Sequence, residues 1–251
     1  MTLSTALGFI GAGDVYLTPI LAGGLFGKRV DVGNTTKLGI KANTVLKEQK
    51  SKKRDSYGQI LENVALLDPA ELSMTLETVN RDGLRYAFCG EDAAYTQTGA
   101  TVVDEVVIMQ LGGWVQLADE ALGATVVLSN TGATVTYVEG VDYDVNRRMG
   151  WVRALVGGAI TDLQSCKIDY VSTTFAGASI RGSVNPQIRA LVELDGVNKV
   201  DESIGILRCW EVVLAPTSEF DWFKDDFNTI ELAGKLKTPP GKSEPFVFYA
   251  R

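Results

Sequence analysis

The stretch "ELSMTLETV" (residues 71–79) decides the fold class, because apolar and polar side chains alternate along it. In a β-strand successive side chains point to opposite faces of the sheet. One face therefore holds Leu72, Met74 and Leu76, and the opposite face holds Glu71, Ser73, Thr75 and Glu77. The pattern predicts a strand that is buried on one side and meets water on the other.

The same alternation recurs along the chain and predicts further strands over residues 37–46, 187–194, 204–214 and 230–237. The clearest helix is predicted over residues 80–91. Asn80 is its expected N-cap and Gly90 its expected end, and the buried face is expected to hold Leu84, Ala87 and Phe88. We therefore expect a mainly β fold, a sandwich or barrel-like sheet with one principal flanking α-helix.

Residues 96–176 differ from the rest, because short apolar runs there are separated by glycine-rich turns. The small, polar residues on both sides suit hinges, and longer strand patterns resume beyond them. The sequence therefore predicts a small all-β domain inserted into a host domain. The host comprises residues 1–95, which begin with an N-terminal arm, and residues 177–251.

Within this block "DYDVNRRMGWVR" (residues 142–153) imitates the start of a calcium-binding EF-hand loop. Position six of such a loop needs glycine and position twelve a bidentate glutamate, but these places hold Arg147 and Arg153. A hairpin is the better interpretation. Its first strand would hold Tyr143 and Val145, its turn Gly150 and its return strand Trp151.

The glycine-rich residues 7–28 invite a nucleotide-binding interpretation, which fails on two counts. Tyr16 stands where a dinucleotide fingerprint needs a small residue, and Pro19 interrupts the helix that should follow. A P-loop also fails, because Arg29 stands where the magnesium-binding serine or threonine should follow Lys28. We expect an N-terminal arm with short extended pieces instead.

The composition argues against several classes of functional site. The 251 residues include no histidine, which removes the commonest general base and the commonest metal ligand, so most hydrolase mechanisms are hard to write for this chain. We expect no cofactor and no metal site. Three widely spaced cysteines, Cys89, Cys166 and Cys209, suggest neither a disulfide framework nor a zinc site. A net charge of −7 argues against a surface that grips nucleic acid. No signal peptide or membrane span is expected.

One local exception to the acidic charge is the stretch "KEQKSKKRDSYG" (residues 47–58), which we expect to form a loop between two strands. It concentrates five cations, Lys47, Lys50, Lys52, Lys53 and Arg54. Such runs are either simply solvated or meet an acidic partner. We treat these residues as candidates for contact with an acidic patch on another copy of the chain.

Four segments in this order resemble the tail tube (major tail) proteins of tailed bacteriophages. They are "GDVYLTPI" (13–20), "RVDVGNTTKLGIKANTVLKEQKSKKRDSYGQ" (29–59), "LSMTLETVNRDGLRYAFCG" (72–90) and "RGSVNPQIRALVEL" with "IGILRCWEVVL" (181–214). The resemblance covers about residues 14–95 and 177–251 and rests on patterns rather than on invariant signatures. The Tyr137–Val152 hairpin also looks like one found in insertions of phage tail proteins.

The resemblance implies a structural virion protein rather than an enzyme. Six copies would form a ring, and rings would stack into a hollow tube through which DNA passes without sequence-specific binding. Implied partners are a tape measure protein, a tail terminator, baseplate or tip proteins and, in a contractile tail, a sheath. The protein would be made in the bacterial host cytoplasm and reside in the virion, with no membrane partner. The inserted block departs from the family pattern.

The net charge of the chain and the alternation in residues 71–77 suggest how such a tube would let DNA pass. A ring of six such chains would carry six times −7, a formal charge of −42, which favours sliding over binding of a polyanion. The polar face of residues 71–77 is the candidate lumen surface, with Glu71, Ser73, Thr75 and Glu77 lining it. The alternative from another class is a carbohydrate-binding or capsid-decorating β-domain of a virion.

Overall fold

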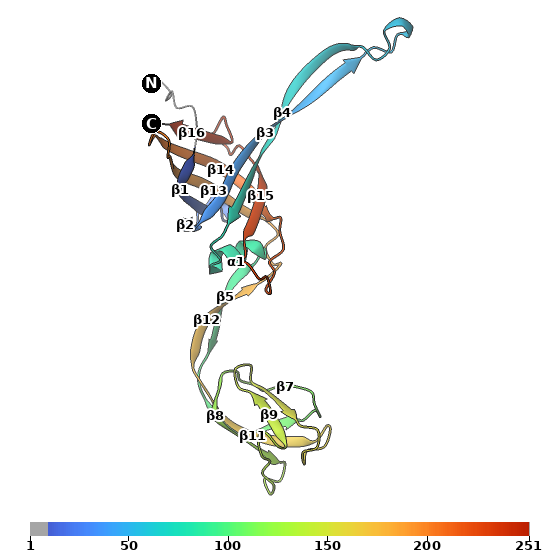
Figure 1. Cartoon of the computed structure of the whole chain (residues 1–251), viewed down its shortest axis with the longest axis vertical. Helices are drawn as coiled ribbons and strands as arrows, with labels where there is room; N and C mark the ends of the chain where they lie inside the picture. Colours follow the sequence, from blue (N-terminus) through green and yellow to red (C-terminus); the bar gives the residue numbers. More distant parts are fainter. Residues whose placement is uncertain (1–9, 251) are drawn as a thin grey trace. The chain divides into compact units, whose positions relative to one another are not determined.

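The computed structural model describes residues 10–250, which hold sixteen β-strands and one α-helix (Figure 1). The prediction of a mainly β protein is therefore confirmed. The chain divides into two compact units, each described by itself. The sheet unit comprises the described residues up to Asp92 and those from Ile180 onward. The insertion unit spans Ala93–Ser179, whereas the sequence analysis placed the insertion at 96–176.

The sheet unit is built on one antiparallel sheet of eight strands. The order is β2-β1-β13-β14-β15-β4-β3, and β16 pairs with β14. The strands are β1 (Gly11–Pro19), β2 (Val30–Asp31), β3 (Thr35–Lys50), β4 (Ile60–Leu76), β13 (Ile188–Asn198), β14 (Ile204–Pro216), β15 (Ile230–Leu236) and β16 (Phe246–Ala250). The five stretches predicted to be strands from alternation coincide with parts of β3, β4, β13, β14 and β15.

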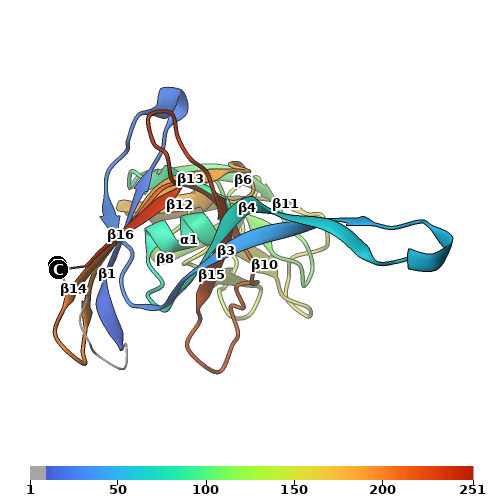
Figure 2. The same ribbon diagram turned by 90° about the horizontal axis from the view of Figure 1, so that it is seen from above.

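The core of the sheet unit lies on one face of this sheet. Leu72, Met74 and Leu76 are at most 1% exposed, as their alternation predicted. Buried side chains from β1, β13, β14 and β15 complete the cluster, among them Val15, Leu17, Ala190, Val192, Cys209, Val212, Leu214, Ile230 and Leu232. Because strands from distant places in the strand order share one cluster, the sheet curls around its own core (Figure 2).

The helix α1 (Arg81–Ala87) begins as predicted but turns a different face to the core. Asn80 caps it, and its side chain accepts a hydrogen bond from the Gly83 amide at 2.7 Å. The buried helix residues are Gly83 and Tyr86, and Ala87 packs against the core as predicted. Leu84 and Phe88 are only half-buried, so the predicted face was right for Ala87 alone. A helix of seven residues has too few turns for periodicity to fix its orientation. Close packing on Gly83 sets it instead.

The end of this helix also differs from the prediction. Cys89, rather than Gly90, adopts the left-handed backbone conformation, with φ of 48°. Gly90 still takes part in the helix end, because its amide donates to the Arg85 carbonyl at 2.8 Å. A Cβ added at Gly90 would also lie 2.6 Å from the Ile180 side chain, so close approach of another segment is a second reason for glycine here.

The N-terminal glycine-rich segment is a strand of the sheet, not an arm, from Gly11 onward. β1 pairs with β13 along all nine of its residues, and Val15 and Leu17 are buried in the core. Between Gly13 and Asp31 the only helical segment of the described chain is the 3-10 turn Ala22–Gly24, so the α-helix that a dinucleotide fingerprint requires does not follow β1. Residues 1–9 of the expected arm lie outside the described residues.

The insertion unit contains two three-stranded sheets. One has the order β7-β10-β9 and the other β6-β11-β8, while β5 pairs with β12. The strands are β5 (Glu91–Gln97), β6 (Thr101–Ile108), β7 (Val115–Gln116), β8 (Leu122–Asn130), β9 (Tyr143–Asn146), β10 (Trp151–Ala154), β11 (Ser165–Ser172) and β12 (Phe175–Arg181). The unit has its own buried cluster, which includes Met109, Leu128, Tyr143, Val152, Cys166, Ile168 and Tyr170.

The hairpin predicted in place of a calcium loop is present. Val145 of β9 pairs with Val152 of β10, and Gly150 has the positive φ (65°) that the turn requires. The Asp142 carboxylate accepts hydrogen bonds from the Val138 and Ala159 amides, each at 2.8 Å, and these bonds lower its pKa. Asp142 thus organises two turns of the backbone, which accounts for an acidic residue at this place without a metal ion.

Candidate functional site

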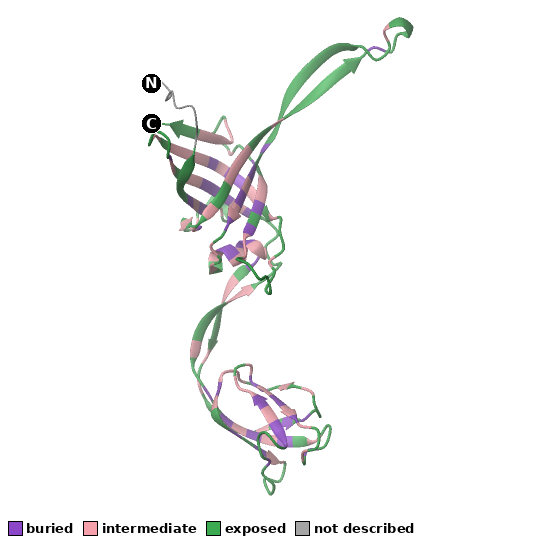
Figure 3. Ribbon diagram, viewed as in Figure 1, coloured by how far each residue is buried: buried purple, intermediate pink, exposed green. Residues whose placement is uncertain are grey.

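β3 and β4 continue far beyond the curled sheet as a two-stranded ribbon, the distal hairpin (residues 43–68). Pro69 marks the junction, because proline cannot donate to the ladder and the register shifts between the pairs Lys41–Glu71 and Asn43–Asp68. Pairing then continues to Lys50 opposite Ile60. All strand residues from Thr44 to Lys50 and from Ile60 to Asp68 are exposed (Figure 3).

The distal hairpin is rich in apolar side chains that meet solvent on both faces. Leu66 and Leu67 are neighbours and so point to opposite faces, yet they are 48% and 91% exposed. Other exposed apolar residues of the ribbon are Val45, Leu46, Ile60, Leu61 and Val64. An isolated two-stranded hairpin is only marginally stable, and open apolar strand edges favour pairing with other chains. The ribbon therefore has the composition of a surface that another molecule covers.

The end of this ribbon, the basic tip (residues 47–58), is folded rather than loose. Ser51 is 4% exposed, and its hydroxyl hydrogen-bonds with the Ser56 hydroxyl at 2.7 Å. The Ser51 amide donates to the Gln59 carbonyl at 2.8 Å, and its carbonyl accepts from the Gly58 amide at 2.9 Å. A 3-10 turn, Arg54–Ser56, closes the end. The tip is thus a preformed structure with a defined set of outward side chains.

The five cations predicted to meet another copy all lie in this basic tip. Lys47 and Lys50 belong to the strand β3 rather than to a loop, which corrects the sequence interpretation. Lys52, Lys53 and Arg54 follow the strand and are exposed. Among the five, Lys50 alone forms an ion pair within the described chain, with Glu48 at 3.3 Å. Most of the positive charge therefore remains available to an external partner.

The candidate lumen face carries both signs of charge, not acidic groups alone. Glu71 is exposed in the middle of a cross-strand row, opposite Lys41 of β3 and Lys235 of β15. Ser73 and Thr75 follow on the same face and are half-buried. A shallow cavity of about 440 Å³ lies over this row, between the strands β3, β4 and β15. The face is polar, as predicted, but its glutamate is flanked by two lysines on the neighbouring strands.

Glu77 lies apart from this row, because β4 ends at Leu76. Its carboxylate accepts a hydrogen bond from the Asn34 side chain at 2.7 Å, and its amide donates to the Asn34 carbonyl at 2.9 Å. Glu77 thus fixes the segment that leads into β3. The structure brings Glu71, Ser73 and Thr75 together on one face of a strand and places Glu77 beyond the strand end.

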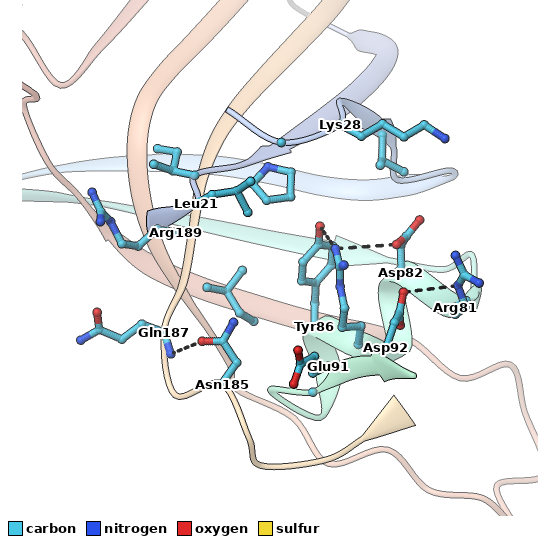
Figure 4. A pocket seen from close by; sticks show the side chains of 17 residues that line it. Leu21, Lys28, Arg81, Asp82, Tyr86, Glu91, Asp92, Asn185, Gln187 and Arg189 are labelled. Carbon is cyan, nitrogen blue, oxygen red and sulfur yellow. Dashed lines mark hydrogen bonds and ion pairs between the residues drawn. The ribbon is translucent and has the colours of Figure 1, made fainter. Parts of the chain in front are cut away.

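A cavity of about 490 Å³ in the sheet unit lies between α1, β1 and β13 (Figure 4). Some of its charged groups pair with one another, whereas Glu91 and Arg189 pair with Arg181 and Glu211 outside the lining. Arg81 pairs with Asp92 at 3.5 Å, and Arg85 pairs with Asp82 at 3.7 Å and donates to the Tyr86 hydroxyl at 2.9 Å. Burial raises the pKa of Tyr86. The cavity therefore presents mostly paired charges and a phenol with a raised pKa, and Lys28 is the lining cation for which the described residues provide no ion pair.

A buried ion-pair cluster in the sheet was missed by the sequence analysis. Glu211 of β14 is 4% exposed and accepts two hydrogen bonds from Arg189 of β13, at 2.8 and 3.0 Å. Lys237 approaches the same carboxylate oxygen at 3.3 Å. The available signal was a single carboxylate inside the otherwise apolar run "CWEVVL". Because Glu211 holds Arg189 of the neighbouring strand, we assign it a structural role.

A second missed feature is the acidic aromatic loop (residues 217–229), which joins β14 to β15. Trp222, Phe223 and Phe227 are 68%, 93% and 87% exposed. Four carboxylates, of Glu219, Asp221, Asp225 and Asp226, are interleaved with them. The signal in the sequence was an aromatic-rich run without strand alternation, "EFDWFKDDF". Exposed aromatic side chains grouped in this way are typical of protein interaction surfaces.

The insertion unit carries an aromatic surface on the outer face of β10. The rings of Trp114 and Trp151 lie 6.4 Å apart, and the Arg153 guanidinium lies 4.3 Å from the Trp114 ring centroid. Arg153 also pairs with Asp144 at 3.0 Å. Trp114 is 37% exposed. Aromatic rings bordered by polar side chains of this kind are able to stack on planar or sugar ligands.

The described residues contain no cluster of metal-binding side chains. Nor does any helix within residues 10–250 have the length and apolar character needed to cross a membrane. No curated protein matches the chain. A family model described as "Protein of unknown function UCP028589" matches residues 8–245. Since this match spans nearly all of the sequence, the chain belongs to that family.

Proposed function

We propose that this protein is a structural subunit of a phage tail, a tail tube protein that assembles into stacked rings around a channel for DNA. The observation that carries the proposal is the distal hairpin, a long ribbon with exposed apolar side chains on both faces. Such a ribbon gains stability only when another chain covers it. Repetition of one contact between identical subunits generates rings or filaments.

The remaining parts of the proposal follow from the family resemblance in the sequence. Six copies form each ring, and the tube contacts a tape measure protein, a terminator and tip or baseplate proteins. The polar face around Glu71 lines the channel. The row of Lys41, Glu71 and Lys235 carries a net charge of only +1 per subunit. Salt-dependent binding of DNA grows with the number of cations that meet phosphates, so we expect this face to hold DNA weakly. The subunit has no catalytic role in this proposal.

The proposal is tested by concentrating the protein and following its assembly by sedimentation velocity and negative-stain microscopy. We expect rings or tubes for the unmodified chain. A variant in which residues 44–67 are replaced by Asn-Gly, a dipeptide suited to a two-residue hairpin turn, should remain folded and monomeric. Asn43 and Asp68 are paired across the ladder, so the shortened hairpin can close there.

A matched control removes exposed apolar side chains elsewhere. The Val103→Ser/Val156→Ser variant changes residues that are 66% and 80% exposed in the insertion unit, and it should assemble normally. A wild-type chain that stays monomeric at high concentration would contradict the proposed function. So would normal tubes from the chain without its distal hairpin.

The aromatic surface of the insertion unit favours one alternative, a carbohydrate-binding β-domain of a virion. Under this alternative the chain would bind glycans through Trp114 and Trp151 without forming tubes. A glycan array separates the two, since a sugar-binding domain should lose its signal in the Trp151→Ala variant. Tube formation together with a blank array would leave only the tail tube proposal.

A further inference from the structure

We propose that the acidic aromatic loop (residues 217–229) is the docking site for the basic tip (residues 47–58) of a second copy of this chain. The inference rests on the proposed self-assembly and names the two surfaces that meet. Three observations carry it: the charges of the two segments, their places in the sheet unit and the exposed aromatic groups in both.

The charges of the two segments are equal and opposite. The basic tip contains five cations and two carboxylates, a net charge of +3. The acidic aromatic loop contains four carboxylates and Lys224, a net charge of −3. Neither Glu219 nor Asp225 forms an ion pair within the described chain, and the same holds for Lys52, Lys53 and Arg54. Complementary charge of this kind steers association and fixes which surfaces meet.

The two segments lie at opposite ends of the sheet unit (Figure 1). The basic tip contains Lys50, whose partner is Ile60 at the start of β4. The acidic aromatic loop is followed by Ile230, whose partner is Leu76 at the end of β4. Sixteen residue steps along the strand separate these places, about 50 Å at roughly 3.3 Å per residue. The segments therefore cannot meet within one chain. They can meet head to tail between two chains, which is the contact that propagates a stack.

Both segments are ordered by contacts within the single chain. In the acidic aromatic loop the Asp221 carboxylate accepts from the Phe223 amide at 2.9 Å, and the Asn228 side chain donates to the Asp221 carbonyl at 2.8 Å. The Trp222 ring stacks on Phe88 at 5.9 Å. Phe223 and Phe227 are left outward, and on the basic tip Tyr57 is 77% exposed. Ordered segments lose less conformational entropy on binding, so their contacts contribute more to affinity.

Two charge-reversed variants test the contact. Lys52→Glu/Lys53→Glu gives a chain in which both segments are acidic, and Glu219→Lys/Asp225→Lys gives one in which both are basic. These four side chains make no hydrogen bond or ion pair within the described chain, so each variant should fold. Each alone should associate at least tenfold more weakly than the wild type in sedimentation velocity. An equimolar mixture should recover association, because each tip then meets a loop of opposite charge.

The matched control is Arg148→Glu/Lys199→Glu, which has the same change of charge at two exposed positions outside both segments. It should associate like the wild type. Zero-length carbodiimide cross-linking of the wild type adds a direct readout, since it joins lysines to carboxylates in contact. We expect cross-linked peptides between residues 47–58 and 217–229, absent at concentrations where the chain is monomeric.

The outcomes separate this inference from the proposed function. A wild type that assembles, while the mixture shows no recovery or the cross-links join other segments, would overturn the docking assignment and leave the tail tube proposal intact. A wild type that does not self-associate would overturn both. Recovery in the mixture but not in either variant alone supports the docking site, because a general effect of charge would not be restored by mixing.

Discussion

The two halves of the strand β4 resemble each other in sequence and differ in their surroundings. Residues 70–76 alternate between buried and partly or fully exposed, with Leu72 fully buried in the core of the curled sheet. Residues 60–69 are richer in leucine, isoleucine and valine, yet every one of them is exposed. The same strand thus places one set of apolar side chains in its own core and presents the other to solvent.

The difference shows how local stability and assembly are divided along the chain. Burial of a leucine side chain contributes roughly 1.5–3 kcal/mol to folding. Residues 60–69 gain no such stabilisation within one chain, because their side chains are exposed. Their apolar surface is available only to a partner. We therefore expect substitutions in the first half to change folding and those in the second half to change association.

The sharpest form of this comparison uses two leucines of β4 that are five residues apart. Leu72→Ala removes a fully buried side chain and should lower the free energy of unfolding by about 2–5 kcal/mol. Leu67→Ala removes one that is 91% exposed and should change it by less than about 0.5 kcal/mol while weakening assembly. Chemical denaturation of the monomer and sedimentation measure the two effects. Equal destabilisation by both variants would contradict the division.

Carboxylates allow the same comparison between the sheet and the distal hairpin. Glu211→Ala leaves Arg189 without its buried partner and should lower the free energy of unfolding by about 1–3 kcal/mol, since one face of the cluster still meets water. Glu48→Ala breaks an exposed pair with Lys50 on the hairpin and should cost at most about 1 kcal/mol. Thermal melting under identical conditions compares the two, and a larger loss from Glu48→Ala would reverse our assignment.

The insertion unit differs from the distal hairpin, because it buries apolar side chains in a core of its own. Burial is the main cause that raises the pKa of Tyr170, and a hydrogen bond to Glu105 adds to it; burial also raises the pKa of Tyr143. Above about pH 10 the unfolded chain therefore loses tyrosine protons that the folded chain retains. The stability contributed by the protonated phenols is complete below this pH and declines as the pH rises.

We accordingly expect the free energy of unfolding of the insertion unit to be flat from pH 8 to 9 and to fall towards pH 11. The Tyr170→Phe variant should show a smaller fall over the same range, despite losing about 1 kcal/mol at neutral pH with its hydrogen bond to Glu105. Near-ultraviolet circular dichroism from Trp114 and Trp151 reports on this unit. If the free energy of unfolding fell equally steeply with pH in the wild type and in Tyr170→Phe, groups other than Tyr170 would govern the pH dependence.

The sequence predicted those parts of the fold in which one chain covers its own apolar groups. Alternation placed Leu72, Met74 and Leu76 in the core, turn chemistry found the 143–152 hairpin, and Asn80 capped the helix. In each of these cases a local pattern and its burial coincide. The orientation of α1 was predicted only for Ala87, because seven residues are too few for periodicity to fix it and because close packing of Ile230 on Gly83 decides it.

The candidate interaction surfaces were harder to predict for a physical reason. Periodicity detects a strand with one buried face, but the distal hairpin has none, so its extent up to Lys50 and from Ile60 was missed. The cations of residues 47–58 were found because charge is visible in sequence. Their counterpart, residues 217–229, was missed because exposure of Phe223 and Phe227 depends on how the loop folds. Alternation within one strand also did not predict that Lys41 and Lys235 would flank Glu71, because it carries no information on which strands pair.

The smallest expected effect concerns this last row, at the point where the two halves of β4 meet. Glu71→Lys would align three lysines across β3, β4 and β15, and like charges opposite one another cost about 0.2–1 kcal/mol per pair. The matched variant in the distal hairpin, Glu62→Lys opposite Gln49, creates no such row and should leave stability unchanged. Because the face is exposed, the loss from Glu71→Lys should shrink in 0.5 M salt.

The same variant tests the proposed channel. If the row lines the lumen, Glu71→Lys raises the charge of the wall by two per subunit, and DNA passage through reconstituted tails should become slow at low salt and recover as salt is added. Lys41→Gln/Lys235→Gln, which changes the charge by two in the opposite direction, should leave passage fast. Unaltered ejection by Glu71→Lys tails at low salt would place this face on the outside of the tube.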